Sequence, residues 1–150
     1  LGNGIKIVRL ADGDNAPESV LGMTLTAFSI HSTKLVQFGF MLSDGDYKLT
    51  CLGDEPYNTE CEKYAKNADI LLCEAFCLYD DREIFHPYEK HHSTAMDAAK
   101  LATELGVKSL LLYHTEEKTI ATRKEKYTAE AKQYFNGNVY VPEDLEVIEG

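Results

Sequence analysis

The sequence has no tryptophan, and only four of its 150 residues are cysteines. Four cysteines with no CxxC pair do not make the framework of a disulfide-stabilised miniprotein. We expect the thiols to be reduced and mostly buried, as in a cytoplasmic protein. The two most closely spaced cysteines, Cys73 and Cys77, lack the second Cys or His pair that a structural zinc site needs.

Long apolar runs and an excess of positive charge are also absent. No run approaches the ~20 residues of a membrane-spanning helix, and the N-terminus lacks the layout of a signal peptide. We therefore expect no membrane partner. The 15 basic residues face 25 acidic ones, a net charge of −10. This balance argues against a stand-alone nucleic-acid binder, because phosphates need counter-charge, although it leaves room for a small basic groove.

Two catalytic or binding motifs are missing as well. No glycine-rich turn follows an early strand, which argues against a flavodoxin-like phosphate site. No Gly-x-Ser-x-Gly elbow is present, which argues against a serine hydrolase of the α/β type.

The composition that remains is that of an ordinary globular chain, with 44% apolar and 27% charged residues. The first half is rich in β-forming residues with alternating polarity. It predicts strands at 24–30, 35–42 and 47–52, with a hairpin turn of Ser-Asp-Gly-Asp at 43–46. These strands are expected to form an antiparallel meander.

The second half alternates helical and strand patterns. The predicted elements, in order, are a helix at 58–67, a strand at 69–73, a helix at 93–105 capped by Ser93 or Thr94, a strand at 108–113, a helix from about 120 to 136, and strands at 139–141 and 145–148. A meander followed by this alternation predicts an α/β sheet with helices on one or both faces.

Five polar residues stand where such a fold places a functional site. His31, Asp54, Glu74 and His114 each follow a predicted strand, and His92 stands just before the helix at 93–105. Sites of open α/β sheets form beyond the carboxyl ends of the strands. Each residue alone is more often a turn or scaffold residue, but imidazoles and carboxylates together are what a hydrolytic metal centre needs.

The five residues lie in the segments FSIHS, LGDEP, LCEAF, HHSTA and LLYHT. Their order resembles the C-terminal half of the metallo-β-lactamase superfamily, and within it the ribonuclease Z-like phosphodiesterase branch. The closing segment VYVPEDLEVIEG resembles the end of that family too. The resemblance runs from about residue 24 to the end. It implies an αββα sandwich, of which residues 1–150 would be one half-domain, the C-terminal half.

The resemblance also implies roles for the site residues. Asp54 matches the carboxylate that bridges two metal ions, and His114 matches a ligand of one of them. His92 matches a histidine near the scissile phosphate, and Glu74 the carboxylate that orients it. His31 matches a histidine near the site that would contact substrate or support the other residues. The cofactors would be two divalent ions, zinc first and manganese as the alternative, and the reaction phosphodiester hydrolysis.

The sequence departs from the family pattern at several positions. Glu55 stands where the family has a Thr, Cys73 where it has a His, and Thr-Glu-Glu-Lys at 115–118 where it has Ser-x-Arg-Tyr. These departures argue against tRNA 3′ processing but not against metal-dependent hydrolysis. The additional histidines His86 and His91 lie in the segment EIFHPYEKHH and are expected to be loop residues.

The family's main metal motif, His-x-His-x-Asp-His, has no match. Asp54 and His114 cannot hold two ions alone, since zinc takes about four ligands. We therefore expect activity to belong to the intact protein, with an N-terminal half supplied in cis or in trans and a nucleic acid or small molecule as phosphodiester substrate. The start at Leu1 without Met fits a fragment. The alternative is a non-catalytic half-fold that associates into homo-oligomers through an exposed sheet face.

Overall fold

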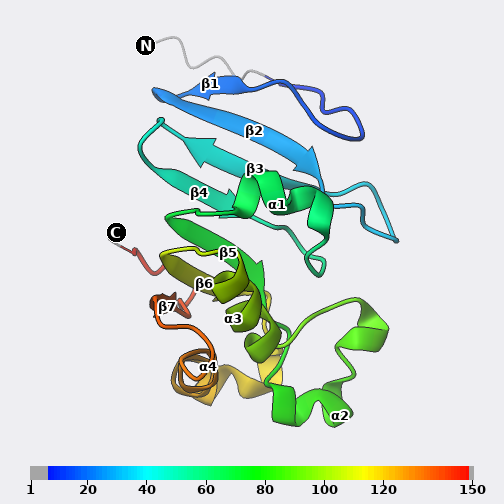
Figure 1. Cartoon of the computed structure of the whole chain (residues 1–150). Helices are drawn as coiled ribbons and strands as arrows, with labels where there is room; N and C mark the ends of the chain where they lie inside the picture. Colours follow the sequence, from blue (N-terminus) through cyan, green and yellow to red (C-terminus); the bar gives the residue numbers. More distant parts are fainter. Residues whose placement is uncertain (1–6, 149–150) are drawn as a thin grey trace.

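All seven strands in the computed structural model, which describes residues 7–148, belong to one sheet and follow one another in chain order (Figure 1). β1 to β4 pair antiparallel, and β4 to β7 pair parallel. The strands are β1 Glu18–Val20, β2 Met23–Ser29, β3 Phe38–Ser43, β4 Lys48–Cys51, β5 Ile70–Glu74, β6 Ser109–Tyr113 and β7 Asn138–Tyr140.

The helices are confined to the parallel part of the chain. The longest, α3, is stabilised by a capping box between Thr94 and Asp97 and is followed by Gly106 at φ +66°. None of the helices in this stretch is long and apolar enough to cross a membrane. The helices are η1 Thr59–Cys61, α1 Glu62–Ala65, η2 Tyr79–Asp81, α2 Arg82–Phe85, η3 Tyr88–Lys90, α3 Ala95–Glu104, η4 Glu117–Thr122 and α4 Arg123–Ala131.

The predicted meander and the alternation that follows it are confirmed, but two strand predictions need correction. Residues 145–148 form no strand: a turn closes from Glu146 N–H to the Glu143 carbonyl, and the side chain of Leu145 is 99% exposed. The strand predicted from residue 35 begins at Phe38, because Leu35 and Val36 lie exposed in the preceding loop. The apolar residues in both segments gave a strand-like pattern, although neither segment pairs with the sheet there.

Three stretches of short elements also differ from prediction. β1 was not expected, because three residues are too few to show a period. The helix predicted at 58–67 is a turn of η1 followed by the four residues of α1. The loop between β5 and α3 contains α2 and η3, neither of them predicted.

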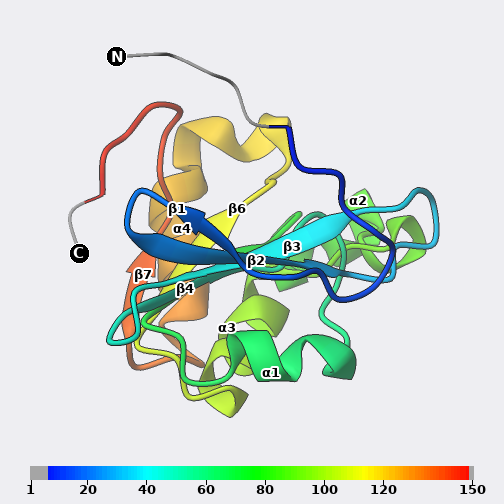
Figure 2. The same cartoon turned by 90° about the horizontal axis from the view of Figure 1, so that it is seen from above.

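One face of the sheet is covered by α1 and α3, which lie on the same side (Figure 2). The strand register aligns one row of inward side chains across six strands, and the ring of Phe28 stacks on Tyr64 with 4.1 Å between centroids. Gly39 leaves room for the Phe28 ring, since a Cβ there would lie 2.6 Å from it. The row consists of Thr26, Met41, Thr50, Leu71, Leu110 and Val139.

The opposite face is apolar but has no matching layer of helices. Two rows of side chains on it are mostly apolar, and their apolar members are all partly or well exposed. Among the described helices, α1 and α3 lie on the other side, and α4 packs on α3 and β7. This is the arrangement expected of half a sandwich. The apolar members, which we call the open face, are Leu25, Ala27, Phe40, Leu42, Leu49, Cys51, Ile70, Leu72, Leu111 and Tyr140.

Candidate metal centre

Four of the five predicted site residues meet at one edge of the sheet. Glu74 is the last residue of β5, and His114 directly follows β6. Asp54 follows β4 by way of Leu52 and Gly53. Because β4, β5 and β6 run parallel, their carboxyl ends lie side by side. The fourth residue, His92, reaches the same edge from the loop before α3.

Asp54, His92 and His114 form a compact group of possible metal ligands. Oδ1 of Asp54 lies 3.0 Å from Nε2 of His114 and 3.7 Å from Nδ1 of His92. One ligand atom from each residue lies within 4.8 Å of the others. An oxygen and two imidazole nitrogens are donors that zinc accepts readily.

Glu74 lies behind His92 and is fully buried. Its Oε2 is 3.6 Å from Nδ1 of His92, while its Oε1 accepts a hydrogen bond from the Ser93 N–H at 2.6 Å. Burial raises the pKa of Glu74 to about 7, against the opposing effect of the Ser93 hydrogen bonds. Burial also lowers the pKa of His92, although Asp54 acts in the opposite direction.

Three buried polar atoms at this edge lack a hydrogen-bond partner anywhere in residues 7–148. They are Oδ1 of Asp54, Oε2 of Glu74 and Nδ1 of His92. Buried polar atoms of native proteins nearly always have a partner, so a group of three that converges on one point suits a bound cation or substrate. Both the donor types and these atoms therefore fit a divalent metal ion, with room for further ligands.

The backbone at the two exposed ligands is held in a sharp turn. His114 has φ +53° and Gly53, next to Asp54, has φ +75°. Non-glycine residues rarely adopt the left-handed region, because it costs conformational energy, and those that do are often found at functional sites. The hydroxyl of Tyr113 donates to the Gly53 carbonyl, so the residue before His114 is tied to the residue before Asp54. This bond spans from the end of β6 to the loop after β4.

An aromatic ring and two lysines border the centre, and the sequence did not single them out. Phe76 stacks on the His92 ring at 5.0 Å and lies 6.3 Å from that of His114. The Lys90 ammonium lies 4.8 Å from the Phe76 ring centroid, and the Lys34 ammonium donates to the Lys90 carbonyl at 3.0 Å. Of these three residues, only Phe76 could have been suspected from the sequence, because it stands two residues after Glu74 at the end of a predicted strand.

His31, the fifth predicted residue, lies outside this group. Its Nε2 is 3.0 Å from a carboxylate oxygen of Glu60. His86 pairs with Glu89 at 3.4 Å, on the surface. Glu55, which stands where the family has Thr, is buried and accepts a 2.6 Å hydrogen bond from the Ser32 hydroxyl.

The four cysteines do not add to the centre. All of them are free thiols, and Cys61, Cys73 and Cys77 are buried. Burial raises the pKa of Cys77 to about 12, which keeps it a neutral thiol. Among residues 7–148, the group of possible metal ligands contains no cysteine, so a zinc site on Cys73 and Cys77 gains no support.

The sequence is also similar to those of known proteins. A ribonuclease Z of Streptococcus pneumoniae is 36% identical over 101 residues, which are 67% of this chain and 32% of that protein. The chain is a homologue of ribonuclease Z. It thus spans about a third of the length of the curated relatives it matches. No protein-family model matches the sequence.

Solved structures show the fold of this ribonuclease Z homologue. The metallo-β-lactamase fold protein YhfI from Bacillus subtilis superposes with a TM-score of 0.69 and 23% identity, over 85% of this chain and 49% of that one. Human tRNase Z, short form, gives 0.65 and 23%, over 88% and 44%. The chain has the metallo-β-lactamase fold. Coverage of about half of each structure fits the expected C-terminal half.

Proposed function

We propose that this ribonuclease Z homologue supplies one half of the active site of a metal-dependent phosphodiesterase. The observation that supports this most is the group of Asp54, His92 and His114, with convergent donor atoms at the carboxyl edge of the sheet. Two of those atoms, and one of the adjacent Glu74, are buried without hydrogen-bond partners in the described chain.

The proposed cofactors are two divalent ions, zinc first and manganese as the alternative. Asp54 would bridge them, because a carboxylate has two oxygens, and His114 would bind one of them. Bound there, the ions would supply a nucleophilic hydroxide and neutralise charge on the phosphate. Asp54 and His114 supply too few donors for two ions, so we propose that the remaining ligands come from an N-terminal half, in cis or in trans.

His92 and Glu74 are proposed to handle the proton. An imidazole beside a carboxylate can deliver a proton to the leaving oxygen, and the carboxylate fixes the orientation of the ring. Glu74 is itself held by the Ser93 N–H, and the Phe76 ring stacks on His92. The imidazole is therefore positioned before substrate arrives.

The substrate is proposed to be a phosphodiester, either a nucleic acid or a small molecule. Lys34 and Lys90 place two ammonium groups near the centre, in a chain that is otherwise strongly acidic. Ammonium groups at the mouth of an acidic site attract phosphate. His31, outside the ligand group, is proposed to contact substrate rather than metal.

Zinc binding by the chain tests the ligand assignment directly. Competition with a chromophoric chelator should show weak zinc binding that Asp54→Ala and His114→Ala each reduce at least about tenfold. His86→Ala is the matched control, since His86 is a half-exposed histidine outside the group. Equal loss in the control would assign the zinc to nonspecific surface histidines.

Hydrolysis by the complete protein tests the reaction. The protein should cleave a chromogenic phosphodiester. Cleavage should stop when chelator is added and return with zinc or manganese. His92→Ala should lower kcat strongly and change KM little. A purified protein that holds no metal and whose activity ignores chelator would refute the proposal.

The second candidate is an association module without catalysis, and the open face favours it. Ten partly exposed apolar side chains on one face of the sheet form a surface suited to association with another protein layer. A second copy of the chain or an N-terminal half would satisfy it equally. Zinc binding lost in Asp54→Ala separates this candidate from the first.

A further inference from the structure

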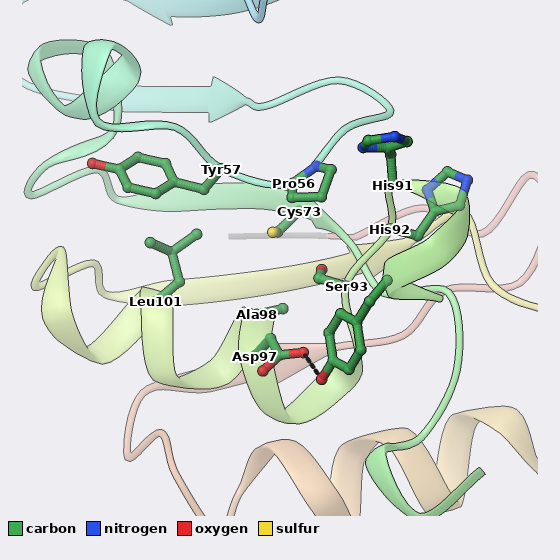
Figure 3. A pocket seen from close by; sticks show the side chains of 10 residues that line it. Pro56, Tyr57, Cys73, His91, His92, Ser93, Asp97, Ala98 and Leu101 are labelled. Carbon is green, nitrogen blue, oxygen red and sulfur yellow. Dashed lines mark hydrogen bonds between the residues drawn. The ribbon is translucent and has the colours of Figure 1, made fainter. Parts of the chain in front are cut away.

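Two loops border a cavity beside the metal centre. The loop after β4 contributes Pro56 and Tyr57 to its wall, and the loop before α3 contributes His91 and His92 (Figure 3). A third loop, residues 30–37 between β2 and β3, makes a side-chain hydrogen bond to each of these two loops. We call residues 30–37 the strap. The strap therefore connects the loops that bear two of the candidate metal ligands.

Three hydrogen bonds form a continuous series through the strap. The Ser32 hydroxyl donates to Oε1 of Glu55 at 2.6 Å and accepts from the Lys34 N–H at 3.3 Å. The Lys34 ammonium in turn donates to the Lys90 carbonyl at 3.0 Å. The series runs from the residue after one candidate ligand to a residue two positions before another.

The middle of the strap depends on this series for its position. At the base of the strap, the Ile30 N–H donates to the Gln37 carbonyl at 3.2 Å. Within the described residues 7–148, the segment 32–36 makes side-chain hydrogen bonds only through Ser32 and Lys34. Loss of the Ser32 contact would therefore release the backbone that carries the Lys34 side chain.

Glu55 is the buried end of the series. Only 6% of this residue is exposed, and it stands where the family has Thr. A buried carboxyl group costs free energy unless it is hydrogen-bonded, and the Ser32 hydroxyl supplies that bond. A Thr hydroxyl oxygen is attached to Cβ directly, two bonds nearer the backbone than a Glu carboxyl oxygen. Glu55 therefore makes a connection that Thr would not reach from the same backbone position.

The Lys34 ammonium lies near enough to the centre to act on it. Burial is the largest cause that lowers the pKa of His92, and the Lys34 ammonium is one of the nearby charges that lower it further. An ammonium beside the centre attracts an anion such as a phosphodiester. Fixing that ammonium in advance removes part of the entropy cost of binding the anion.

We propose that Glu55 is a positioning residue for substrate binding. Through the Ser32 hydroxyl it fixes the strap, and the strap presents the Lys34 ammonium to the phosphate of the substrate. Glu55 itself contacts neither metal nor substrate. The proposal rests on the proposed function for the identity of the anion, and it assigns a role to a residue outside the group of metal ligands.

Steady-state hydrolysis of bis(4-nitrophenyl) phosphate by the complete, zinc-loaded protein tests this role. Lys34→Ala, Ser32→Ala and Glu55→Ala should each raise KM about fivefold, as expected for one lost contact, and change kcat by less than about twofold. The double variant of Glu55→Ala with Lys34→Ala should be no worse than Lys34→Ala alone, because Glu55 acts through that ammonium. Lys126→Ala, at an exposed position of α4, is the control. Additive losses in the double variant, or a fall in kcat with KM unchanged, would overturn the proposal.

Conservative variants separate positioning from support of the fold or of the metal. Glu55→Gln retains an oxygen that accepts from the Ser32 hydroxyl, so it should recover most of the KM that Glu55→Ala loses. Zinc affinity should be the same in Glu55→Ala as in wild type. A loss as large as that of Asp54→Ala would show that Glu55 supports the ligand instead. If Glu55→Ala fails to fold, Ser32→Ala and its rescue by Ser32→Thr decide, because Ser32 lies on a half-buried part of a loop.

Tryptic cleavage of the chain tests the strap without substrate or metal. The peptide bond after Lys34 lies in the exposed part of the strap, and it should be cut about fivefold faster in Ser32→Ala than in wild type. Cleavage after the exposed Lys118 is the internal control. Equal rates at Lys34 in both proteins would overturn the proposal.

Failure of this role and failure of the proposed function give different results. Phosphodiester hydrolysis with the same KM in all variants would remove the role of Glu55 alone. A complete protein that hydrolyses no phosphodiester would remove the proposed function. Calorimetric titration with the same diester then decides the role of Glu55, since the fivefold losses should appear in the dissociation constant and equal affinities would refute it.

Discussion

Both faces of the sheet are apolar, but helices cover only one of them. On the helix-covered face, Leu71 and Leu110 are fully buried, on the strands against which α3 packs. On the open face, their strand neighbours Leu72 and Leu111 remain partly exposed. Because alternate residues of one strand supply both faces, the strands are built to be buried on both sides. One face of the sheet is therefore covered by helices, and the apolar side chains of the other face are available for contact with another protein layer.

The largest effect on stability should come from a substitution in the core of the helix-covered face. Leu71→Ala should lower the free energy of unfolding by about 2–5 kcal/mol, because it leaves a cavity in a packed core. Leu72→Ala, one residue away on the open face, should cost about 1 kcal/mol, since its side chain is already partly in water. Urea denaturation measures both. Equal losses would mean that the open face is covered in solution.

The next effect concerns what covers the open face when the chain is alone. We expect self-association, and Leu42→Glu, on that face, should shift sedimentation toward monomer by weakening the contact about tenfold or more. Leu145→Glu is the control, because Leu145 is fully exposed in a turn away from the sheet. A wild-type chain that sediments as a monomer at all concentrations would contradict the expectation.

The same contrast explains what could be predicted from sequence. The apolar runs within residues 69–73 and 108–113 predicted strands, and both strands are present, although their side chains on the open face are only partly buried. The alanine stripe of α3 was equally clear, and of the two predicted caps, Ser93 and Thr94, the structure has Thr94. The apolar residues near 35 and 145 gave the same local signal without a layer to pack on, and single-sequence patterns cannot register that absence.

The site shows a similar limit. Strand ends brought Asp54, Glu74 and His114 together as expected, because parallel strands align their carboxyl ends. His31 also follows a strand, but β3 lies between β2 and β4, so the end of β2 is farther along the sheet from the parallel strands. Loop conformation, which leaves no periodic pattern in the sequence, brings Phe76, Lys34 and Lys90 to the site.

A smaller effect, on zinc affinity, is expected at the carboxyl edge of the sheet. Tyr113→Phe removes the hydrogen bond to the Gly53 carbonyl and should weaken zinc binding by the chain up to about tenfold, because the ends that bear Asp54 and His114 are no longer tied. The thermal midpoint should change little. Tyr140→Phe, on the same face, is the control. Equal zinc affinity in wild type and Tyr113→Phe would show that the tie does not position the ligands.

The smallest effect lies on the helix side, where Glu130 of α4 accepts from the backbone N–H groups of Tyr79 and Met96. Burial raises the pKa of Glu130 above its usual value, although these two hydrogen bonds lower it. The folded state therefore holds the proton more tightly than the unfolded state, and stability from this group is lost as the pH rises from about 4 through the raised pKa. Glu130→Gln keeps an acceptor without the charge, so its stability relative to wild type should increase across that interval, by less than about 1 kcal/mol. Urea denaturation at pH 4 and pH 7 measures the change, with the exposed Glu125→Gln on the same helix as control. A relative loss of stability at pH 7 would show that the carboxylate, and not the neutral acid, is the form that caps α3.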